Sequence, residues 1–363
     1  MVRYICFVIL LLGLGIEARA NDSLEVEKPK KENWFRRTLR NFSEIDENYV
    51  EPQHYNWSAM LQATYNYDIY KLASDGQHKQ SLTFAPEPSM KAGPYFGWRW
   101  VFMGYTFDLK NLNFSSNKQG FEFSFYAAQV GVDLFWRRTG SDYKIRNVKL
   151  GDQVKDDFLE DHPFDGLKVG ITGANVYYIF NHKRFSYPAA FAQSTCQKIS
   201  CGSWMAGVGY LSNTLSFDHE NLQKLVEEKG DISVKLDSSL MFNEVKYFDV
   251  NASVGYAYNW VFARNCLFCA SLSMALAYKN SRGETVSKEE RGFDFKNFNV
   301  DGIGRFGIVW NNTQWYAGAS AIIRSYNYHK SRFSANNIFG SLNFYVGYNF
   351  GKRKQYKQNQ SKQ

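Results

Sequence analysis

The sequence predicts an all-β fold, a transmembrane antiparallel β-barrel of about twelve strands within a range of roughly ten to fourteen, on three observations. Polar and apolar residues alternate over stretches long enough to cross a bilayer. The face opposite the apolar one carries Ser, Gly, Ala and Asn, the small residues that fill or line a lumen. Aromatic residues make up 17% of the chain, as expected if aromatic girdles mark both membrane interfaces.

Residues 247–279 show this alternation best. Apolar residues occupy every second position from Phe248 to Phe262, and the pattern resumes from Ala270 to Tyr278 after a break at 263–268. Both runs reach the length of about 9–11 residues that a tilted membrane strand needs, so they predict a spanning β-hairpin. Aromatic side chains gather beside its turn, as at a membrane interface: Tyr256, Tyr258, Trp260 and Phe262.

Residues 1–20 predict a cleaved secretory signal peptide. Arg3 precedes an apolar run at 4–16, and Ala18, Arg19 and Ala20 form a small-x-small cleavage site. We therefore expect an exported protein that is localised to the outer membrane. The mean hydropathy of −0.44 argues against a helical membrane protein but not against a barrel, because only every second residue of a barrel strand faces lipid.

Residues 21–55 form a charged leader that differs in composition from the rest of the chain. Within it, 32–42, from Glu32 to Phe42, has apolar residues on one helical face and arginines on another, which predicts a short amphipathic helix. The alternatives for this segment are a helix on the membrane surface, a stopper in the barrel mouth, a helix packed on the barrel, or disordered chain.

Residues 56–350 are predicted to form the barrel. A change of phase near Ala127 suggests a bulge, and Asp218 is expected to cap a loop helix that ends at Glu228. Long polar loops at 137–165 and 280–297 contrast with short turns, which is the outer-membrane pattern. In chain order the expected strands cover 57–69, 82–96, 100–109, 121–136, 167–180, 185–193, 203–217, 248–262, 270–278, 300–310, 314–324 and 338–350.

The last expected strand ends at the aromatic Phe350. Such a strand resembles the insertion signal that the barrel-assembly machinery recognises, although most such barrels stop at the aromatic residue. Here a basic tail follows at 351–363, with Lys352, Arg353 and Lys354. The expected partners are therefore outer-membrane lipid and, during insertion, the barrel-assembly machinery.

Four stretches of the expected mature chain form a recognisable set: Tyr49-Val50-Glu51-Pro52, Gly93-Pro94-Tyr95-Phe96-Gly97-Trp98-Arg99-Trp100, Arg137-Arg138-Thr139-Gly140-Ser141-Asp142-Tyr143 and Phe185-Ser186-Tyr187-Pro188-Ala189-Ala190-Phe191. With them the chain resembles an uncharacterised domain-of-unknown-function family of outer-membrane β-barrel proteins from gut anaerobic Gram-negative bacteria. The resemblance implies a fold and a location, and it implies no activity.

Polar residues at inward positions are candidates for lining the lumen. The same residues are consistent with a satisfied ion network that plugs it. The candidates are Asp249, Asn251, Asn259, Arg305 and Arg324.

Cysteines supply a second set of candidate residues. Short spacings and an oxidising compartment predict local disulfides that join Cys196 to Cys201 and Cys266 to Cys269, and buried free thiols are the alternative. A zinc site would need both pairs close in space, and a redox site would need a βαβ context, so neither is expected.

No motif predicts catalysis or a cofactor. Gly302, Gly304 and Gly307 match G-x-G-x-x-G but lie inside a strand rather than before a helix. The sequence contains neither H-E-x-x-H nor G-x-S-x-G. We therefore expect no catalytic residues, no metal and no cofactor.

The sequence thus predicts an outer-membrane barrel that acts as a channel, a transporter or a structural membrane component on an unknown substrate. The net charge of +8 is spread through loops and the tail of an exported chain, so nucleic acid is not an expected partner. Two alternatives remain open, a barrel-borne hydrolase that acts on lipid or peptide and a soluble exported β-sandwich that binds glycan.

Overall fold

The computed structural model describes residues 44–358 with gaps at 75–79, 99–100, 105–106, 110–118, 140–141, 152–158, 231–234, 284–297 and 331–332. The predicted signal peptide, the predicted helix at 32–42 and the end of the basic tail lie outside the described residues. No helix among the described residues is long and apolar enough to cross a membrane.

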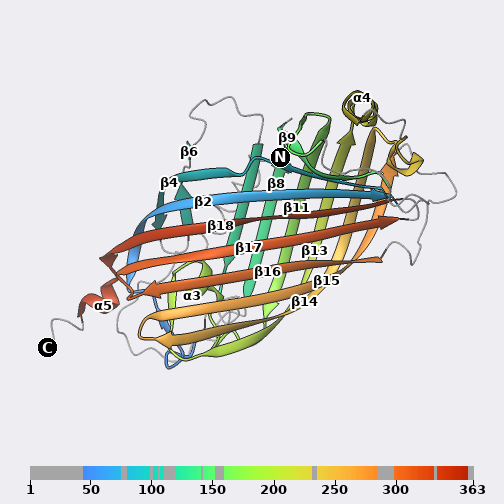
Figure 1. The fold of residues 1–363 in the computed structure, drawn as a ribbon. Coiled ribbons are helices and arrows are strands. Elements are labelled where there is room, and N and C mark those ends of the chain that lie inside the picture. The colour runs from blue at the N-terminus through green and yellow to red at the C-terminus, as the bar shows by residue number, and fades with distance from the viewer. Residues whose placement is uncertain are drawn as a thin grey trace. The chain divides into compact units, whose positions relative to one another are not determined.

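Among the described residues, sixteen strands form one antiparallel sheet that curls around its own inner face (Figure 1). Six of the longest strands, from β13 to β18, pair in sequence order, and β18 then pairs with β2 along most of its length. These strands are β2 (Tyr55–Ser74), β13 (Cys201–Phe217), β14 (Glu244–Ala263), β15 (Cys266–Gly283), β16 (Phe298–Asn311), β17 (Trp315–Lys330) and β18 (Phe333–Lys352).

The remaining strands flank this group on both sides. Next to β13 the order continues with β11, β8 and β7, while β2 pairs with β3 along one half and with β4 along the other. Their bounds are β3 (Ser81–Pro86), β4 (Ser89–Trp98), β5 (Val101–Gly104), β6 (Phe107–Asp108), β7 (Gln119–Tyr126), β8 (Val130–Arg138), β9 (Tyr143–Lys149), β10 (Pro163–Phe164) and β11 (Leu167–Ile179).

The predicted fold class, an antiparallel all-β membrane-type barrel sheet, is confirmed, but the sheet has more strands than the expected twelve or so. Only eleven of its strands have eight residues or more. The predicted strand 82–96 is divided by Pro86 and Pro88, since proline cannot donate a ladder hydrogen bond. The expected bulge near Ala127 is instead a turn, in which the Ala127 amide donates to the Val130 carbonyl at 2.9 Å.

Side chains alternate between the two faces as the period-two pattern requires. On β14 and β15, Val254 and Leu272 point outward with 57% and 62% of their surface exposed, whereas Asp249 and Ala277 point inward and are fully buried. The predicted hairpin is confirmed, because β14 and β15 pair from Val245 and Gly283 to Ala263 and Cys266. The sandwich alternative required two stacked sheets, and it does not fit one curled sheet.

The two ends of the sheet differ. The short-turn end carries the turns at 127–129, 264–265 and 312–314, together with the start of β2 and the end of β18. The opposite, long-loop end carries α4 (His219–Gly230) and η1 (Ser238–Leu240). The predicted loop helix is therefore confirmed, and Asp218 caps it, with the Asn221 amide donating to Asp218 Oδ1 at 3.0 Å.

The predicted strand at 185–193 is wrong. Its central part is α3 (Tyr187–Phe191), followed by the short strand β12 (Thr195–Gln197), which pairs with β1 (Val50–Pro52) in a separate two-stranded sheet. Ser186 caps α3 by accepting a hydrogen bond from the Ala189 amide, and Pro188 sits in its first turn, where its missing N–H costs nothing. Polar and apolar alternation in so short a segment did not outweigh these helix signals.

Candidate functional site in the interior of the sheet

All five predicted lumen candidates lie on the inner face, and their exposed fractions run from 0% to 7%. Asp249 and Asn251 share β14 with Asn259, while Arg305 and Arg324 come from β16 and β17. The five do not form one cluster. They belong to different layers of an interior that is filled from one end to the other.

The middle layer is built of buried ion pairs that cross the interior. Arg305 on β16 pairs with Asp133 on β8, although β15, β14, β13 and β11 separate these strands in the sheet. Ser124 Oγ donates to Asp133 Oδ1 at 2.7 Å, and the Arg305 guanidinium lies 5.3 Å from the centre of the Tyr177 ring. Such a charge is tolerated in an interior only because it is paired.

Arg324 forms a second crossing. Its guanidinium lies 2.7 Å from a carboxylate oxygen of Glu122 on β7, and it stacks 5.1 Å from the centre of the Phe135 ring. The Arg324 side chain is 1% exposed and that of Glu122 is 37% exposed. The pair therefore runs from the buried interior to its margin beside β7.

A third group of charges joins neighbouring strands. Lys279 Nζ on β15 lies 3.0 Å from Asp301 Oδ1 on β16 and 3.7 Å from Asp249 Oδ2 on β14. The Asn327 amide also donates to Asp301 Oδ1, at 2.9 Å. Two carboxylates thus share one ammonium group, and all three side chains are buried.

Asp133, Glu122, Lys279 and Asp301 were missed as candidates. Lys279 had a signal in the sequence, since it is a charged residue on a strand face otherwise made of Ser and Ala. Asp133 was missed for another reason. It lies beyond the turn at 127–129, and the change of phase in the alternation there was interpreted as a bulge within one strand.

An apolar layer fills the interior toward the long-loop end. Phe135 on β8 lies 5.9 Å, between ring centres, from Phe339 on β18, so the opposite walls of the curled sheet touch. The ring centres of Phe84, Phe164 and Phe217 lie 5.5 to 6.0 Å apart in the same cluster. Leu222 of α4 is fully buried against this layer, which closes it on the loop side.

The short-turn end is closed by residues 181–200, which we call the plug and which connect β11 to β13. Tyr187 Oη donates to Ser271 Oγ at 2.8 Å, and Gln193 Nε2 donates to Tyr345 Oη at 2.7 Å. A Cβ at Gly307 would lie 3.2 Å from the Ala190 carbonyl oxygen, so a glycine lets α3 (Tyr187–Phe191) approach β16 closely. The plug is therefore fastened to the inner wall at several strands.

Gly302 and Gly304 behave differently from Gly307. Both face outward, and a Cβ at Gly302 would meet nothing within 4 Å. The glycine run therefore does not act as a unit, and it is placed inside β16 without a following helix, as the sequence indicated.

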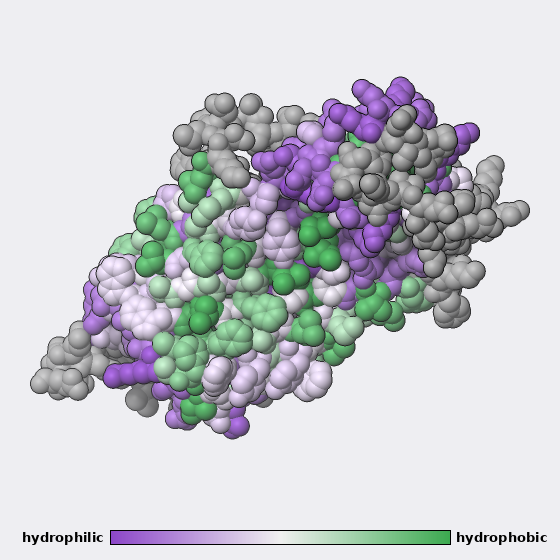
Figure 2. All heavy atoms as spheres, viewed as in Figure 1, coloured by the Kyte–Doolittle hydropathy of each residue, from purple (hydrophilic) through white to green (hydrophobic). Residues whose placement is uncertain are grey.

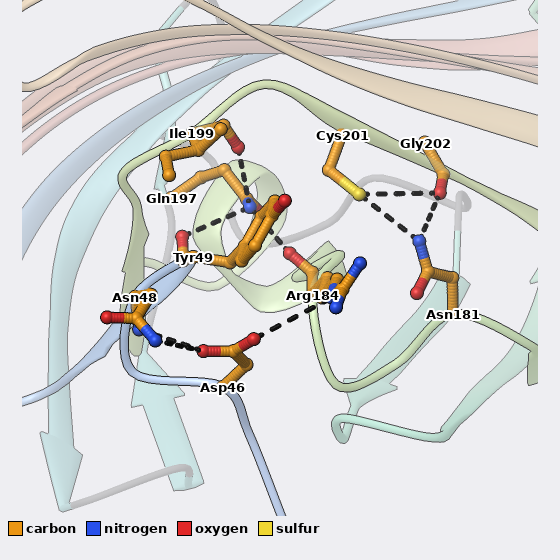
Figure 3. Close-up of polar contacts among 9 residues, drawn as sticks. All are labelled: Asp46, Asn48, Tyr49, Asn181, Arg184, Gln197, Ile199, Cys201 and Gly202. Carbon is orange, nitrogen blue, oxygen red and sulfur yellow. Dashed lines mark hydrogen bonds and ion pairs between the residues drawn. The ribbon is translucent and has the colours of Figure 1, made fainter.

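Gln197 is the centre of the plug (Figure 3). Its Nε2 lies within hydrogen-bond distance of the carbonyl oxygens of Tyr49, Arg184 and Ile199, at 3.2, 2.7 and 3.0 Å. An amide has two N–H groups, so these contacts share its protons. Its Oε1 accepts from the Ser186 amide at 2.9 Å and from Asn259 Nδ2 at 3.0 Å, which gives Asn259 a role in holding the plug.

Residues 44–54, which we call the strap, run along the outside of the plug. Besides the pairing of β1 with β12, the Asp46 amide donates to the Lys183 carbonyl at 2.7 Å, and Lys198 Nζ donates to the Glu47 carbonyl at 2.9 Å. Asp46 also lies 3.6 Å from Arg184 (Figure 3). The strap and the plug thus form one structure held mainly by backbone hydrogen bonds.

A small cavity of about 30 Å³ remains between these layers, with room for about two water molecules. It lies next to the charged layer, and Arg305 Nε, Asp301 Oδ2 and Tyr177 Oη beside it are buried without a hydrogen-bond partner. Water is the ligand that such atoms require. Side chains that line the cavity include those of Asn175, Tyr177, Asn251, Ser253, Ser273, Asp301, Arg305 and Tyr326.

All four cysteines of the described chain are free thiols, which contradicts the predicted disulfides. Cys266 and Cys269 lie three positions apart on β15, so their side chains point to opposite faces and their Cα atoms are about 10 Å apart, beyond the 4.4–6.8 Å of a disulfide. Cys196 and Cys201 have separate neighbours: Cys196 Sγ donates to the Asn311 carbonyl, and Cys201 Sγ accepts from Asn181 Nδ2.

We therefore expect Cys196, Cys201, Cys266 and Cys269 all to be alkylated when the protein is denatured and treated with iodoacetamide without a reductant. Burial raises the pKa of the Cys196 thiol to about 12, so in the folded protein at pH 8 it is protonated and should resist alkylation. Mass spectrometry of peptides counts the modified residues. Recovery of a disulfide-linked peptide, or rapid labelling of Cys196 in the folded state, would contradict this arrangement.

No group of three or more His, Cys, Asp or Glu side chains that could hold a metal ion occurs within the described part of the chain. His54 lies 3.3 Å from Glu51, and its ring stacks 4.1 Å from that of Tyr356. His54 and Glu51 both lie on the strap, away from the residues that line the cavity. Among the described residues, no hydrogen bond joins His54 to the hydroxyl group of a serine.

A family model described as "Domain of unknown function (DUF4421)" matches residues 44–350. No curated protein matches the chain. Among solved structures, the outer-membrane protease OmpT from Escherichia coli is similar with 10% identity and a TM-score of 0.34, over 81% of this chain and 97% of that one. The translocator domain of autotransporter NalP from Neisseria meningitidis has 10% identity and a TM-score of 0.31, over 81% and 88%. The outer membrane protein OprG from Pseudomonas aeruginosa has 10% identity and a TM-score of 0.23, over 83% and 98%.

Proposed function

We propose that this chain, which belongs to the DUF4421 family of unknown function, is an integral outer-membrane barrel whose interior is closed by its own side chains and which acts as a structural component of the membrane. The observation that carries the proposal is the contact between opposite walls. Within the described part of the chain, rings and ion pairs from opposite walls meet across the interior, and we infer that they block passage from one end of the barrel to the other.

The outer face supports insertion into a membrane. Leu61 on β2, Val208 on β13 and Leu272 on β15 are each more than 60% exposed, on strands that lie far apart around the sheet. Figure 2 shows hydrophobic side chains gathered across the middle of this face and hydrophilic ones at the end that carries α4. A soluble protein seldom exposes so extended an apolar surface, whereas lipid covers it without cost.

Aromatic residues mark the edge of this apolar belt at the short-turn end. Several have more than 40% of their surface exposed next to the turns, as expected for a membrane interface. They are Trp57, Phe180, Trp204, Tyr256, Tyr258, Trp260, Phe262, Trp310 and Trp315. By the usual arrangement of short periplasmic turns and longer outer loops, this end with the plug and the strap faces the periplasm.

The interior supports a structural role over an open channel. The plug, the ion pair of Arg305, and the ring contacts of Phe135, on which Arg324 stacks, occupy the same interior from the short-turn end toward the long-loop end. A pore would have to break all three. The cavity beside Arg305 has room for about two water molecules and is too small for a solute such as a sugar or an amino acid.

A gated transporter is the second candidate, because the plug lies between the small cavity and the short-turn end of the barrel, which we assign to the periplasm.

Measurements of conductance distinguish the closed barrel from the gated transporter. We expect the purified protein in a planar bilayer to show no stepwise conductance, and a variant with residues 185–197 replaced by a Gly-Ser linker of equal length to show none either, since the apolar layer remains. Stepwise conductance of the linker variant alone would favour the gated transporter, and conductance of both proteins would refute a closed barrel.

A further inference from the structure

We propose that a row of exposed cations on one side of the barrel, at the long-loop edge of the apolar belt, binds the phosphate groups of an anionic membrane lipid. The row consists of Arg138 on β8, Lys168 on β11 and Lys246 on β14, and we call it the basic row. This inference rests on the proposed membrane insertion, and it adds a ligand and a site to it.

Strand register places the ends of the basic row on one line across the strands. Arg138 pairs with Gly170, Gly170 with Thr214, and Thr214 with Lys246. Directly paired residues share a face of the sheet, so Arg138 and Lys246 both stand on the outer face, three strands apart or about 14 Å. Lys168 is the next outward-facing residue after Gly170 toward the long-loop end, and it lies on β11, between the strands of Arg138 and Lys246.

Each member of the row faces outward and is exposed. Gly170 and Thr214 fill the gap between Arg138 and Lys246 with no side chain and a short one, which leaves a shallow floor between the cations. A phosphate above this floor would meet long basic side chains on either side and a hydroxyl beneath. The width of the row exceeds one phosphate group and suits a headgroup that carries two.

The apolar belt ends directly below the row. The Arg138 guanidinium stacks 5.6 Å from the centre of the Trp136 ring, and Trp136 is the next outward residue toward the membrane. On β14 the next outward residue below Lys246 is Phe248, which is 37% exposed. The cations therefore stand where acyl chains end and lipid headgroups begin.

The acidic neighbours leave the row with a net positive charge. Glu244 lies 2.7 Å from Lys246, and both side chains are well exposed, so this pair contributes little to stability and its lysine remains available to a stronger anion. Asp218, beyond the end of β13, caps α4 and does not face the row. The row and Glu244 together carry two more positive than negative charges.

The opposite wall at the same end has a different composition. There Lys71 pairs with Asn336, and Asn336 with Asn327, so Lys71 stands beside two neutral amides. On β9 of the same wall, Lys144 and Arg146 are each paired with a carboxylate, that of Glu87 and that of Asp161, while Lys149 is exposed. Acids thus offset two of the cations on that wall, whereas the basic row keeps a net positive charge.

The test compares two variants with an equal loss of charge. The first replaces the row, Arg138→Gln/Lys168→Gln/Lys246→Gln. The control replaces exposed lysines elsewhere, Lys71→Gln/Lys224→Gln/Lys229→Gln, of which the last two lie on α4. Native mass spectrometry of the protein released from detergent micelles counts bound molecules of a diphosphorylated disaccharide lipid, with phosphatidylglycerol and inorganic phosphate as comparison ligands.

We expect the wild type and the control to retain the diphosphorylated lipid, with weaker binding as salt rises, and the row variant to bind it about a hundredfold less, since each cation near an anionic headgroup contributes roughly fivefold. Equal binding by the row variant and the wild type, or equal loss in both variants, would overturn the proposal. Retention of inorganic phosphate alone would also overturn it. Insertion of each protein into phosphatidylcholine vesicles, followed by heat-modifiable gel mobility, tests the proposed function separately, because that insertion does not require an anionic lipid.

Discussion

Replacing Asp133 by alanine should destabilise the folded protein by about 3–5 kcal/mol, because it leaves the Arg305 guanidinium buried without its counter-ion. Arg305 is 2% exposed and Asp133 is fully buried, so bulk solvent does not reach the guanidinium, and a water molecule in the small cavity beside it carries no charge to replace that of the carboxylate. The free energy of unfolding is measured by urea titration in detergent micelles, with tryptophan fluorescence as the signal.

An exposed ion pair provides the matched control. Glu87 lies 2.6 Å from Lys144, and the two side chains are 57% and 29% exposed, so Glu87→Ala should cost no more than about 1 kcal/mol. The double replacement Asp133→Leu/Arg305→Met removes both charges and should recover much of the loss, since it leaves no unpaired ion. If Asp133→Ala unfolds at the same urea concentration as Glu87→Ala, the pair does not hold the walls together in the way we describe.

Replacing Leu272 by arginine should cost about 2–4 kcal/mol in a lipid bilayer, the penalty for a cation on the lipid face near the middle of the membrane. Leu272 is 62% exposed, so the larger side chain meets no steric obstacle, and in water the same substitution would be nearly neutral. The stability of the variant in phosphatidylcholine vesicles is followed by heat-modifiable gel mobility. It therefore shows whether lipid or water surrounds residue 272, and it does not depend on packing inside the protein.

Met241→Arg is the control for this substitution. Met241 is 41% exposed but lies after η1, in the connection at the long-loop end and outside the apolar belt. It should tolerate arginine without measurable loss. Equal effects at both positions would mean that lipid does not cover β15, and the proposed insertion would then be wrong.

The number of strands and the position of the plug were only partly predictable. Proline at 86 and 88 broke one expected strand, and the turn at 127–129 divided another, which raised the count. Residues 185–193 alternated well enough to suggest a strand, yet Ser186 and Pro188 favour a helix start, and the segment also finds partners inside the barrel that local pattern cannot reveal.

The sequence by itself determined the strands of the hairpin at 247–279, the face on which each residue lies, and the helix capped by Asp218. These follow from alternation and capping, which depend on residues a few positions apart. Only the tertiary structure decided that Asp133 meets Arg305 and that Phe135 meets Phe339. Such contacts join residues more than a hundred positions apart, and they depend on how far the sheet curls, which sets the distance between its opposite walls and is encoded by no single stretch of the chain.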